Sequence, residues 1–509
     1  MYTIHLFRSL KGRLILCGAG TEVSHNYLKR NGLFRFRRSR VGTQYFCAIL
    51  CKISMVSYIQ EWQWPIRCDP AKREPVLMVG QVEMFSRTLW SAITPAHSPV
   101  PPLHGALRAD VTVVGGGLLG LSIALGLARR GASVILLEGQ NIAFGASGRN
   151  TGFVVPGLKG SLSVDAVRAL VGPEKGDALL TLIGQGGNYV FDLIKTLGIE
   201  CSAEQRGCLQ PVPMSGDMAQ IEKMVKWNQA AGIESEILDE RQITQVSGIK
   251  GYRGALLLPT GGQINPLAYA LGLNDAIVRH GGRVYLGHAR RLKRYGRTWC
   301  VEVSGGASVQ SDQVIVATNA LTGDLLPKVA RSIIPVWAYQ VATQRMDAGV
   351  RERILPGHQT FVDLRLHPFA VRWSPDGRLI TGGAAKIHDP GAVDRMAKAF
   401  LRRLARFIPD LPPLQAEYAW NGRIAVTNDF MPRLWNVDTG LYAPIGCNGR
   451  GVALTSVFGR AISDYLVSRD EKDLPLPITQ PKPYPLHGVV RHAPSAWLAQ
   501  AQLRDWIGG

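Results

Sequence analysis

The sequence predicts an α/β fold, and three observations support this prediction. Two short apolar segments, residues 111–114 and 133–137, have the composition of buried parallel strands. Between them lie a cluster of glycines and a helix-compatible segment, residues 118–130. Residues 330–420 are rich in β-type segments with the turn signals of antiparallel structure. Together these features predict a βαβ unit followed by a mixed α+β part.

The first 77 residues differ in composition from the rest of the 509-residue chain. They contain 13 Lys or Arg and 4 Asp or Glu, so they carry +9 of the formal net charge of +20. They show no sustained period and lack the order of a secretory signal. We expect residues 1–77 to be a basic extension that is disordered or non-native, with Met78 or Met84 as the natural first residue. An Arg-rich transit peptide is the alternative.

Pro-rich segments border the central part of the chain. Residues 78–107 form a lead with prolines at 95, 99, 101 and 102. Because proline excludes helix at its own position and disfavours it at the one before, we expect this lead to be extended and ordered structure to start after it. Residues 471–509 form a second Pro-rich tail, expected on the surface, in which residues 489–506 have the composition of a short helix.

Between these segments the pattern predicts several further elements. The hairpin within residues 361–385 has the clearest turn, Ser374-Pro-Asp-Gly377. The other expected elements are helices near 217–231 and 266–280 and strands at 283–286, 298–303, 313–318, 369–373 and 379–381.

Excess positive charge favours phosphate and anionic surfaces as partners, but its distribution here does not support them. Outside residues 1–77 the chain carries +11 over 432 residues, and the densest cluster, residues 290–297, falls on an expected strand and turn. We interpret this cluster as a solvated face and expect no nucleic-acid partner. A nucleic-acid or membrane-surface binder that uses residues 1–77 stays an alternative.

The eight cysteines are scattered, and none forms a C-x-x-C pair. We therefore expect neither a disulfide framework nor a metal site, and we expect a reducing, cytoplasmic location. The apolar run at residues 111–128 has the length of a membrane span. Five glycines interrupt it, so we predict no transmembrane segment.

The glycine cluster is the first chemical signal. Gly115, Gly117 and Gly120 occupy the positions of G-x-G-x-x-G directly after the first strand. The first permits a tight turn, the second lets the backbone approach a pyrophosphate, and the third lets helix and strand pack closely. Glu138 ends the second strand 18 residues after Gly120, where a carboxylate can bind ribose hydroxyls. The pattern predicts a bound dinucleotide, FAD or NAD rather than NADP.

A second loop, Gly145-Ala-Ser-Gly-Arg-Asn150, follows the second strand. It resembles the G-A-S-G-R-N-G-G loop of FAD-dependent oxidoreductases in the D-amino-acid oxidase superfamily, especially the gamma-glutamylputrescine oxidoreductase branch. The resemblance implies FAD as the cofactor, with Gly145, Ser147, Arg149 and Asn150 along its pyrophosphate and under its isoalloxazine ring. Small residues let the ring lie against backbone, while a hydroxyl and a guanidinium meet phosphate oxygens or ring edges.

A late segment, residues 440–454, is similar to the family's strand, glycine turn and helix. Asn448 and Arg450 replace the usual Ser and His. In the family this helix points its N-terminus at the pyrimidine side of the flavin, so the resemblance implies that Arg450 stabilises the reduced cofactor, with exposure to solvent as the alternative. We interpret Cys447 as incidental rather than as a covalent flavin attachment. The residues expected to contact flavin here are Gly446, Asn448, Gly449, Arg450, Gly451 and Val452.

Weaker correspondences extend the resemblance to residues 85–470. They are residues 314–320, which place Thr318 beside the cofactor, and residues 261–266 and 420–432. The resemblance implies a Rossmann-like FAD-binding domain interleaved with a substrate domain on an antiparallel sheet. We assign the oxidoreductase to residues 108–470, with the FAD part at about 108–175, 250–330 and 420–470 and the substrate part at about 176–249 and 331–419.

The resemblance also implies oxidation of a C–N bond to an imine, with electrons passed to O2 or another acceptor. Superfamily oxidases of free amino acids usually carry G-x-R-P, whose arginine binds the substrate carboxylate, whereas this chain has Gly422-Arg-Ile-Ala425. We therefore favour an amine or an N-substituted amino acid like gamma-glutamylputrescine. The alternatives are a D-amino-acid or sarcosine-type dehydrogenase and a redox-accessory flavoprotein. Tyr339, Gln340 and Arg372 are our candidates for the catalytic, substrate-contacting residues.

Overall fold

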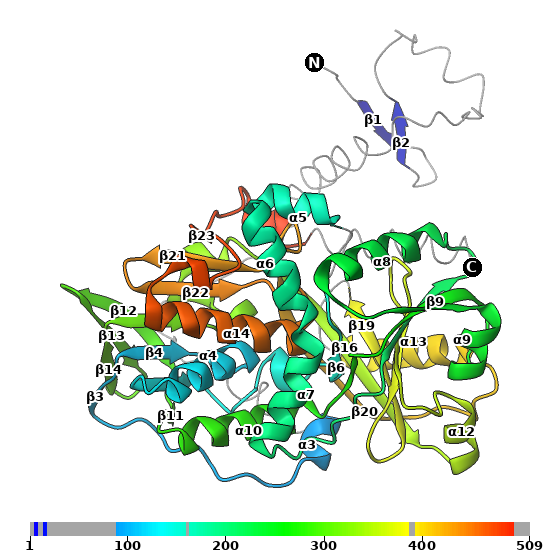
Figure 1. The fold of residues 1–509 in the computed structure, drawn as a ribbon, viewed down its shortest axis with the longest axis horizontal. Helices are drawn as coiled ribbons and strands as arrows, with labels where there is room; N and C mark the ends of the chain where they lie inside the picture. The colour runs from blue at the N-terminus through cyan, green and yellow to red at the C-terminus, as the bar shows by residue number, and fades with distance from the viewer. Residues whose placement is uncertain (1–4, 9–13, 18–87, 159–161, 386–391, 493–509) are drawn as a thin grey trace. The chain divides into compact units, whose positions relative to one another are not determined.

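The computed structural model of the chain describes residues 5–8, 14–17, 88–158, 162–385 and 392–492 (Figure 1). The chain divides into two units, Met1–Asp69 and Pro70–Gly509. In the first unit, β1 (His5–Arg8) pairs in antiparallel orientation with β2 (Leu14–Cys17). The rest of the expected N-terminal extension, Met78, Met84 and residues 493–506 of the expected C-terminal helix lie outside the described residues.

A seven-stranded sheet contains the predicted βαβ unit. Its strands β4 (Val111–Val114) and β5 (Val134–Glu138) are parallel neighbours joined by α4 (Leu118–Arg129). On the other side of β4 follow β15 (Gln313–Val316) and β22 (Leu441–Ile445), both parallel to it. The full order is β11-β5-β4-β15-β22-β21-β23, where β11 is Arg283–Leu286, β21 is Arg433–Asp438 and β23 is Ile478–Thr479. The predicted α/β class is confirmed.

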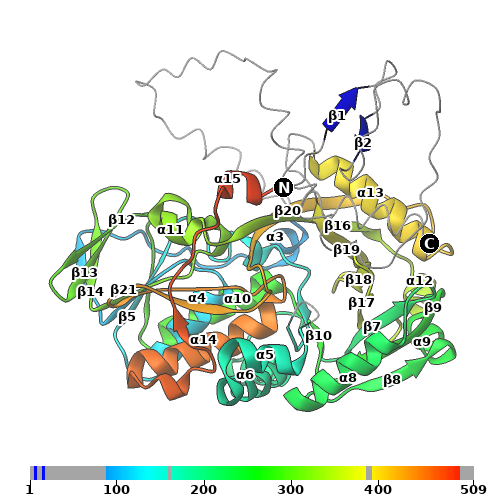
Figure 2. The ribbon, with the colours of Figure 1, turned by 90° about the horizontal axis from the view of Figure 1, so that it is seen from above.

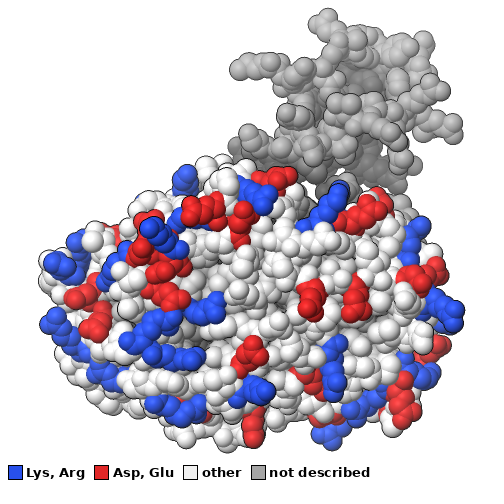
Figure 3. Space-filling model, viewed as in Figure 1, with Lys and Arg blue, Asp and Glu red and all other residues white. Residues whose placement is uncertain are grey.

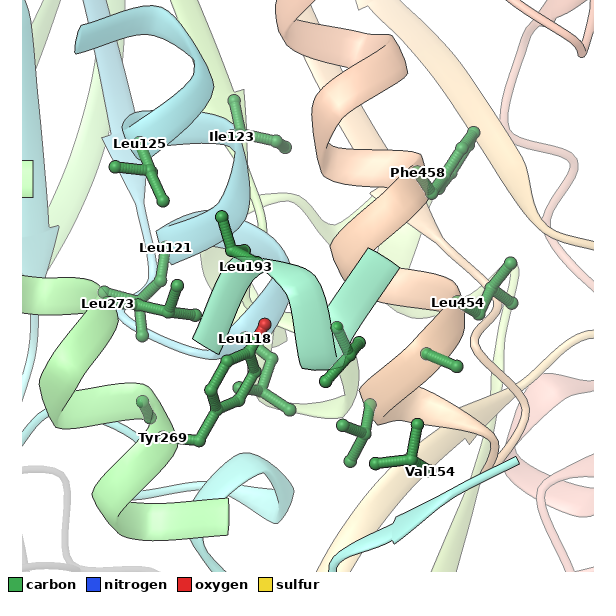
Figure 4. Close-up of a cluster of buried hydrophobic side chains, with 14 of the residues drawn as sticks. Leu118, Leu121, Ile123, Leu125, Val154, Leu193, Tyr269, Leu273, Leu454 and Phe458 are labelled. Atoms are coloured by element: carbon green, nitrogen blue, oxygen red, sulfur yellow. The ribbon is translucent and has the colours of Figure 1, made fainter. Parts of the chain in front are cut away.

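Both faces of this sheet are covered, which explains why its strands are apolar throughout. Val113 and Leu136 point to one face and pack against helices, whereas Val114 and Leu137 point to the other. The helices on the first face are α4, α7 (Gly186–Leu197), α10 (Pro266–Arg279) and α14 (Gly451–Ser468), whose apolar side chains meet in one core (Figure 4). A four-stranded sheet of β12 (Ala289–Tyr295), β13 (Thr298–Val303), β14 (Ser308–Ser311) and β3 (Ala106–Arg108) contributes to the core of the second face.

An eight-stranded sheet forms the other part of the second unit. Its order is β20-β16-β19-β18-β17-β7-β9-β8, and all neighbours are antiparallel except β17 and β7. The strands are β20 (Ala416–Val426), β16 (Ile334–Arg345), β19 (Arg378–Ala385), β18 (Ala370–Trp373), β17 (Thr360–Val362), β7 (Cys208–Pro213), β9 (Tyr252–Leu258) and β8 (Glu236–Asp239).

The two faces of the eight-stranded sheet have different neighbours. On the outer face, Tyr339 and Val341 pack against Phe400 of α13 (Ala392–Phe407), which lies along this face (Figure 2). The inner face carries Arg372 and Trp420, and it packs against residues 146–152, which follow β5. The loop after the βαβ unit therefore lies between the two sheets.

The predicted elements of the central part are confirmed, including α8 (Ala219–Ala231), α10 and the β18–β19 hairpin. Two predictions at its borders are wrong. Residues 89–93 are not extended, because α3 (Leu89–Ile93) forms ahead of the first proline, and Thr88 Oγ1 caps it by accepting a hydrogen bond from Ser91 N at 3.0 Å. After residue 470 the chain does not simply lie on the surface, since β23 joins the sheet and Leu476 is buried.

The division into an FAD part and a substrate part stays a prediction, although the sheets depart from the assigned ranges at two strands. Both β9 and β20 belong to the eight-stranded sheet, whereas the sequence analysis assigned β9 and residues 420–426 of β20 to the FAD part. Helices α5 (Val164–Val171) and α6 (Pro173–Gly184) were not predicted.

Charges on the second unit are mixed in sign. On the face in Figure 3, Lys and Arg are interspersed with Asp and Glu. Within the basic cluster at residues 290–297, Lys293 pairs with Glu302 at 2.6 Å and Arg294 pairs with Asp438 at 3.1 Å. Over the described part of the chain, no helix has both the length and the apolar character that crossing a membrane requires.

Candidate functional site

The expected cofactor segments meet at one edge of the seven-stranded sheet. Residues 115–117 follow β4, residue 139 follows β5, Thr318 lies two residues after β15, and residues 446–450 follow β22. Because these four strands are parallel neighbours, their carboxyl ends share one edge, which is where open α/β sheets bind ligands.

The glycine turn has the geometry that its motif predicts. Gly115 has φ +112°, a conformation that residues with a side chain rarely adopt, and its N–H donates to Leu137 O at 2.8 Å. A Cβ on Gly120 would overlap the carbonyl oxygen of Gly115, so only glycine lets α4 begin this close to the turn. Thr318 lies directly beside the turn: its methyl carbon Cγ2 is 3.3 Å from the position that a Cβ on Gly115 would take.

Glu138 turns its carboxylate back toward the glycine turn. Oε2 accepts a hydrogen bond from Gly116 N at 2.7 Å, and Oε1 accepts one from Gln140 N at 2.9 Å. Burial raises the pKa of this carboxyl, while the backbone N–H groups around it oppose that shift. Each oxygen retains a lone pair, so the carboxylate can accept ribose hydroxyls as the sequence predicts.

The loop at residues 145–150 is attached to the start of α4. Ser147 Oγ accepts a hydrogen bond from Leu118 N at 2.9 Å, and a Cβ on Gly117 would lie 2.9 Å from the same oxygen. The Asn150 side chain donates to Ser147 O at 2.6 Å and accepts from Gly152 N at 2.7 Å. Asn150 therefore shapes the loop, while Ser147 keeps a hydroxyl hydrogen for a phosphate next to the helix N-terminus.

Arg149 connects this loop to the eight-stranded sheet. It is buried, and it donates from Nε to Phe144 O at 2.9 Å and from Nη1 to Asn421 O at 3.1 Å. Desolvation lowers the pKa of its guanidinium to about 10, so it stays charged at neutral pH. The sequence analysis expected the Arg149 guanidinium to meet phosphate oxygens or ring edges. In the structure, two of the three guanidinium nitrogens donate to backbone carbonyls.

Two tryptophans that the sequence analysis did not assign to the site hold the same loop. Trp90 Nε1 donates to Asn150 O, and Trp420 Nε1 donates to Arg149 O, both at 2.8 Å. The two rings meet edge to face with their centroids 6.4 Å apart. Trp90 belongs to α3, inside the Pro-rich lead, and only its large apolar side chain signalled a packed residue there.

The turn before α14 completes the cofactor edge. Gly446, Asn448 and Gly449 all have positive φ, and the buried Asn448 fixes the turn by donating to Gly446 O and accepting from Thr427 N. Gly451 and Val452 begin α14. Arg450 precedes that helix and donates from Nη1 to Pro156 O at 3.2 Å, while desolvation lowers its pKa. A guanidinium at the positive end of an 18-residue helix makes this end favourable for an anion.

These residues fit a bound FAD. Gly116 and Gly117 carry no side chain at the start of α4, where a pyrophosphate would meet the backbone, and the Glu138 carboxylate lies beside them with lone pairs left to accept hydrogen bonds. At the other end of the edge, α14 and Arg450 would provide positive charge for the pyrimidine side of a flavin. Residues 145–152 connect the two ends along the inner face of the eight-stranded sheet.

The structure separates the three candidate catalytic residues. Tyr339 lies on the outer face, among the side chains of α13. It therefore faces away from the cofactor loop, although the sequence analysis proposed it as a substrate-contacting residue. Gln340 alternates with it and points to the inner face, opposite Trp420 in the strand register. Arg372 also points inward and donates from Nη1 to Thr151 O and Ile264 O, each at 2.9 Å. Desolvation lowers the pKa of Arg372 to about 9.

Arg423, the arginine of the Gly422-Arg-Ile-Ala425 segment, points to the outer face. Its guanidinium lies over the ring of Trp337, 5.7 Å from the centroid. The neighbouring Gly422 points inward, where a Cβ would contact Ala146 and Arg149.

Comparisons with known proteins agree with this arrangement. The family model described as FAD dependent oxidoreductase (DAO) matches residues 110–465, which contain the glycine turn, the loop at residues 145–150 and the turn before α14. Gamma-glutamylputrescine oxidoreductase of Escherichia coli (strain K12) is 31% identical over 380 residues, covering 74% of this chain and 88% of that protein. Glycine oxidase of Geobacillus kaustophilus (strain HTA426) is 22% identical over 375 residues, covering 72% and 94%.

Solved structures share the fold. L-proline dehydrogenase from P. horikoshii superposes with a TM-score of 0.60 at 17% identity and covers 72% of this chain and 94% of its own. L-amino acid deaminase from Proteus vulgaris superposes with a TM-score of 0.59 at 21% identity and covers 75% and 97%.

Replacing Glu138 with alanine should weaken FAD binding about tenfold or more, because the ribose loses its carboxylate partner. Titration of the apoprotein with FAD, followed by flavin fluorescence, measures the Kd. Asp110→Ala is the matched control: Asp110 accepts a backbone N–H from Ser133 at the opposite end of the same strands, so its loss should leave the Kd unchanged. An unchanged Kd in Glu138→Ala would contradict the assignment.

Replacing Trp420 with phenylalanine should raise the Kd for FAD several-fold, because the loop carbonyl of Arg149 loses its donor while the ring packing remains. Trp299→Phe removes a similar indole hydrogen bond, to Thr439 O, far from the cofactor edge. Both variants should lower the free energy of unfolding by about 1 kcal/mol. Equal Kd values for FAD in the two variants would show that Trp420 does not position the loop.

Proposed function

The chain belongs to the DAO family of FAD dependent oxidoreductases, and we propose that it oxidises a C–N bond in an amine or N-substituted amino acid of the gamma-glutamylputrescine type. Its cofactor is FAD, and relatives in this family are named for reactions on amines or amino acids. The proposal concerns the substrate and the site that receives it.

The orientation of Arg423 is the observation that supports an amine over a free amino acid. A substrate α-carboxylate is best bound by the two parallel N–H groups of an arginine. On β20 the only arginine lies over Trp337 on the outer face, and the inward position is Gly422. This strand therefore offers no guanidinium to a substrate at the inner face.

In the proposed reaction, an R–CH2–NH2 group loses two electrons and two protons to become an imine, which water hydrolyses to a carbonyl and ammonia. Bound FAD would supply the electron acceptor for this step, with O2 or another oxidant as the final acceptor. The protein must keep the amine uncharged. Arg372 on the inner face and Arg450 at α14 disfavour a second positive charge nearby, so they lower the pKa of a bound amine.

A second candidate function is oxidation of a secondary or D-amino acid. One observation favours it: Nη2 of the buried Arg372 has no hydrogen-bond partner among the described residues, so it can bind a carboxylate. Its other two nitrogens already donate to backbone carbonyls, which leaves Arg372 without the free pair that a bidentate clamp needs.

An anaerobic titration separates these functions. The FAD-loaded protein should lose its flavin absorbance with gamma-glutamylputrescine at lower concentration than with putrescine, and not with sarcosine or D-alanine. Bleaching by an amino acid alone would contradict the amine proposal. A protein that takes up no FAD would contradict the whole assignment.

Arg450 should raise the reduction potential of bound FAD, because its charge favours the electron-rich form. We expect Arg450→Gln to lower the potential by about 30 mV or more, which is a tenfold change in a two-electron equilibrium. Arg450→Lys keeps the charge and should retain most of the potential. Dye-coupled spectroelectrochemistry measures both variants, and equal potentials in wild type and Arg450→Gln would place Arg450 away from the flavin.

A further inference from the structure

Two buried glutamines occupy one row of the inner face. The strand register aligns Gln340, Gly382, Ala370, Val362 and Gln210 across β16, β19, β18, β17 and β7. Neighbouring strands lie about 4.8 Å apart, so the Cα atoms of the two glutamines are about 19 Å apart. We call these five residues the inner row.

Both ends of the inner row carry a polar atom that lacks a partner. Gln210 is 1% exposed and Gln340 is 8% exposed. Within the described part of the protein, Gln210 Nε2 and Gln340 Oε1 make no hydrogen bond. Buried polar groups are normally paired, so an unpaired donor at one end and an unpaired acceptor at the other indicate a ligand with complementary ends.

The middle of the inner row cannot provide those partners. Gly382, Ala370 and Val362 have no polar side-chain atom. The amide of Gln340 extends over Gly382, where a Cβ would overlap its oxygen, so it points along the row toward Gln210. Arg372 lies two residues from Ala370 on the same face of β18, and among the described residues its Nη2 has no hydrogen-bond partner.

The end of the row at Gln340 lies next to the cofactor loop. Gln340 is opposite Trp420 in the sheet, and the Trp420 indole holds the carbonyl of Arg149. The end at Gln210 is four strands farther away, beyond Arg372. A ligand along the row therefore has one end at the cofactor loop and the other remote from it.

We propose that the inner row is the subsite that selects an acylated diamine, a class of substrate with an amine at one end and a carbonyl or carboxylate at the other. Gln340 Oε1 accepts an N–H of the amine next to the cofactor loop. Gln210 Nε2 donates to an oxygen of the remote acyl end. This inference rests on the proposed function and assigns the residues that make it specific.

Two ligands that each lack one end test the two glutamines separately. The γ-butylamide of glutamate keeps the acyl end but has no terminal amine, so it binds without being oxidised. Its Kd, measured by isothermal titration calorimetry, should rise about tenfold in Gln210→Met and stay unchanged in Gln340→Met. Putrescine has only the amine end. Its apparent Kd from anaerobic bleaching should rise in Gln340→Met and stay unchanged in Gln210→Met.

Gln313→Met is the matched control, because Gln313 is another buried glutamine with an unpaired oxygen, located on β15 away from the inner row. It should leave both Kd values unchanged, and thermal unfolding checks that all three variants are folded. Failure of the butylamide to bind wild type, or equal binding to wild type and Gln210→Met, would overturn the proposal. If the butylamide binds through Gln210 but no amine bleaches the flavin, the proposed function is wrong and the subsite stands.

Discussion

The backbone of residues 145–152 is the part on which the rest of the site depends, because side chains from α3 and from the eight-stranded sheet hold its carbonyl oxygens. Trp90 and Trp420 bind the carbonyls of Asn150 and Arg149, and Arg372 binds that of Thr151. On the other side, Ser147 accepts the N–H of Leu118 at the start of α4. A loop fixed at each of these points cannot move without disturbing both the dinucleotide-binding turn and the inner face.

Two buried guanidiniums take part in this arrangement. Arg149 and Arg372 are both at most 5% exposed, and desolvation lowers the pKa of each, yet both stay protonated at neutral pH. Burying such a charge is costly, and here the hydrogen-bond partners of both guanidiniums are neutral backbone carbonyls. At Arg372 the Glu204 carboxylate adds an electrostatic attraction, which opposes the lowering of the pKa by burial. Positive charge at the inner face disfavours a protonated amine.

The local parts of the site could be predicted from the sequence, and the parts that depend on tertiary contacts could not. The G-x-G-x-x-G glycines and Glu138 lie within one βαβ unit, so their spacing in the sequence is enough to predict that Glu138 lies beside the glycine turn. Trp90 was missed because its role arises only when α3 packs under a loop 60 residues later. Tyr339 was assigned to the site although it points outward, since alternation identifies two faces of a strand but not which one faces the cofactor. The inner row could not be predicted, because its residues become neighbours only through the pairing of five strands. The order of these strands in the sheet differs from their order in the sequence.

Product analysis tests the central claim, that this FAD-dependent oxidoreductase oxidises the amine end of an acylated diamine. The FAD-loaded protein is incubated with gamma-glutamylputrescine in air and with an artificial electron acceptor, and the mixture is examined by mass spectrometry and ammonia assay. The account predicts the aldehyde in place of the terminal amine, one ammonia for each aldehyde, and an intact γ-glutamyl amide. Unchanged substrate with both acceptors, or release of free glutamate, would contradict it.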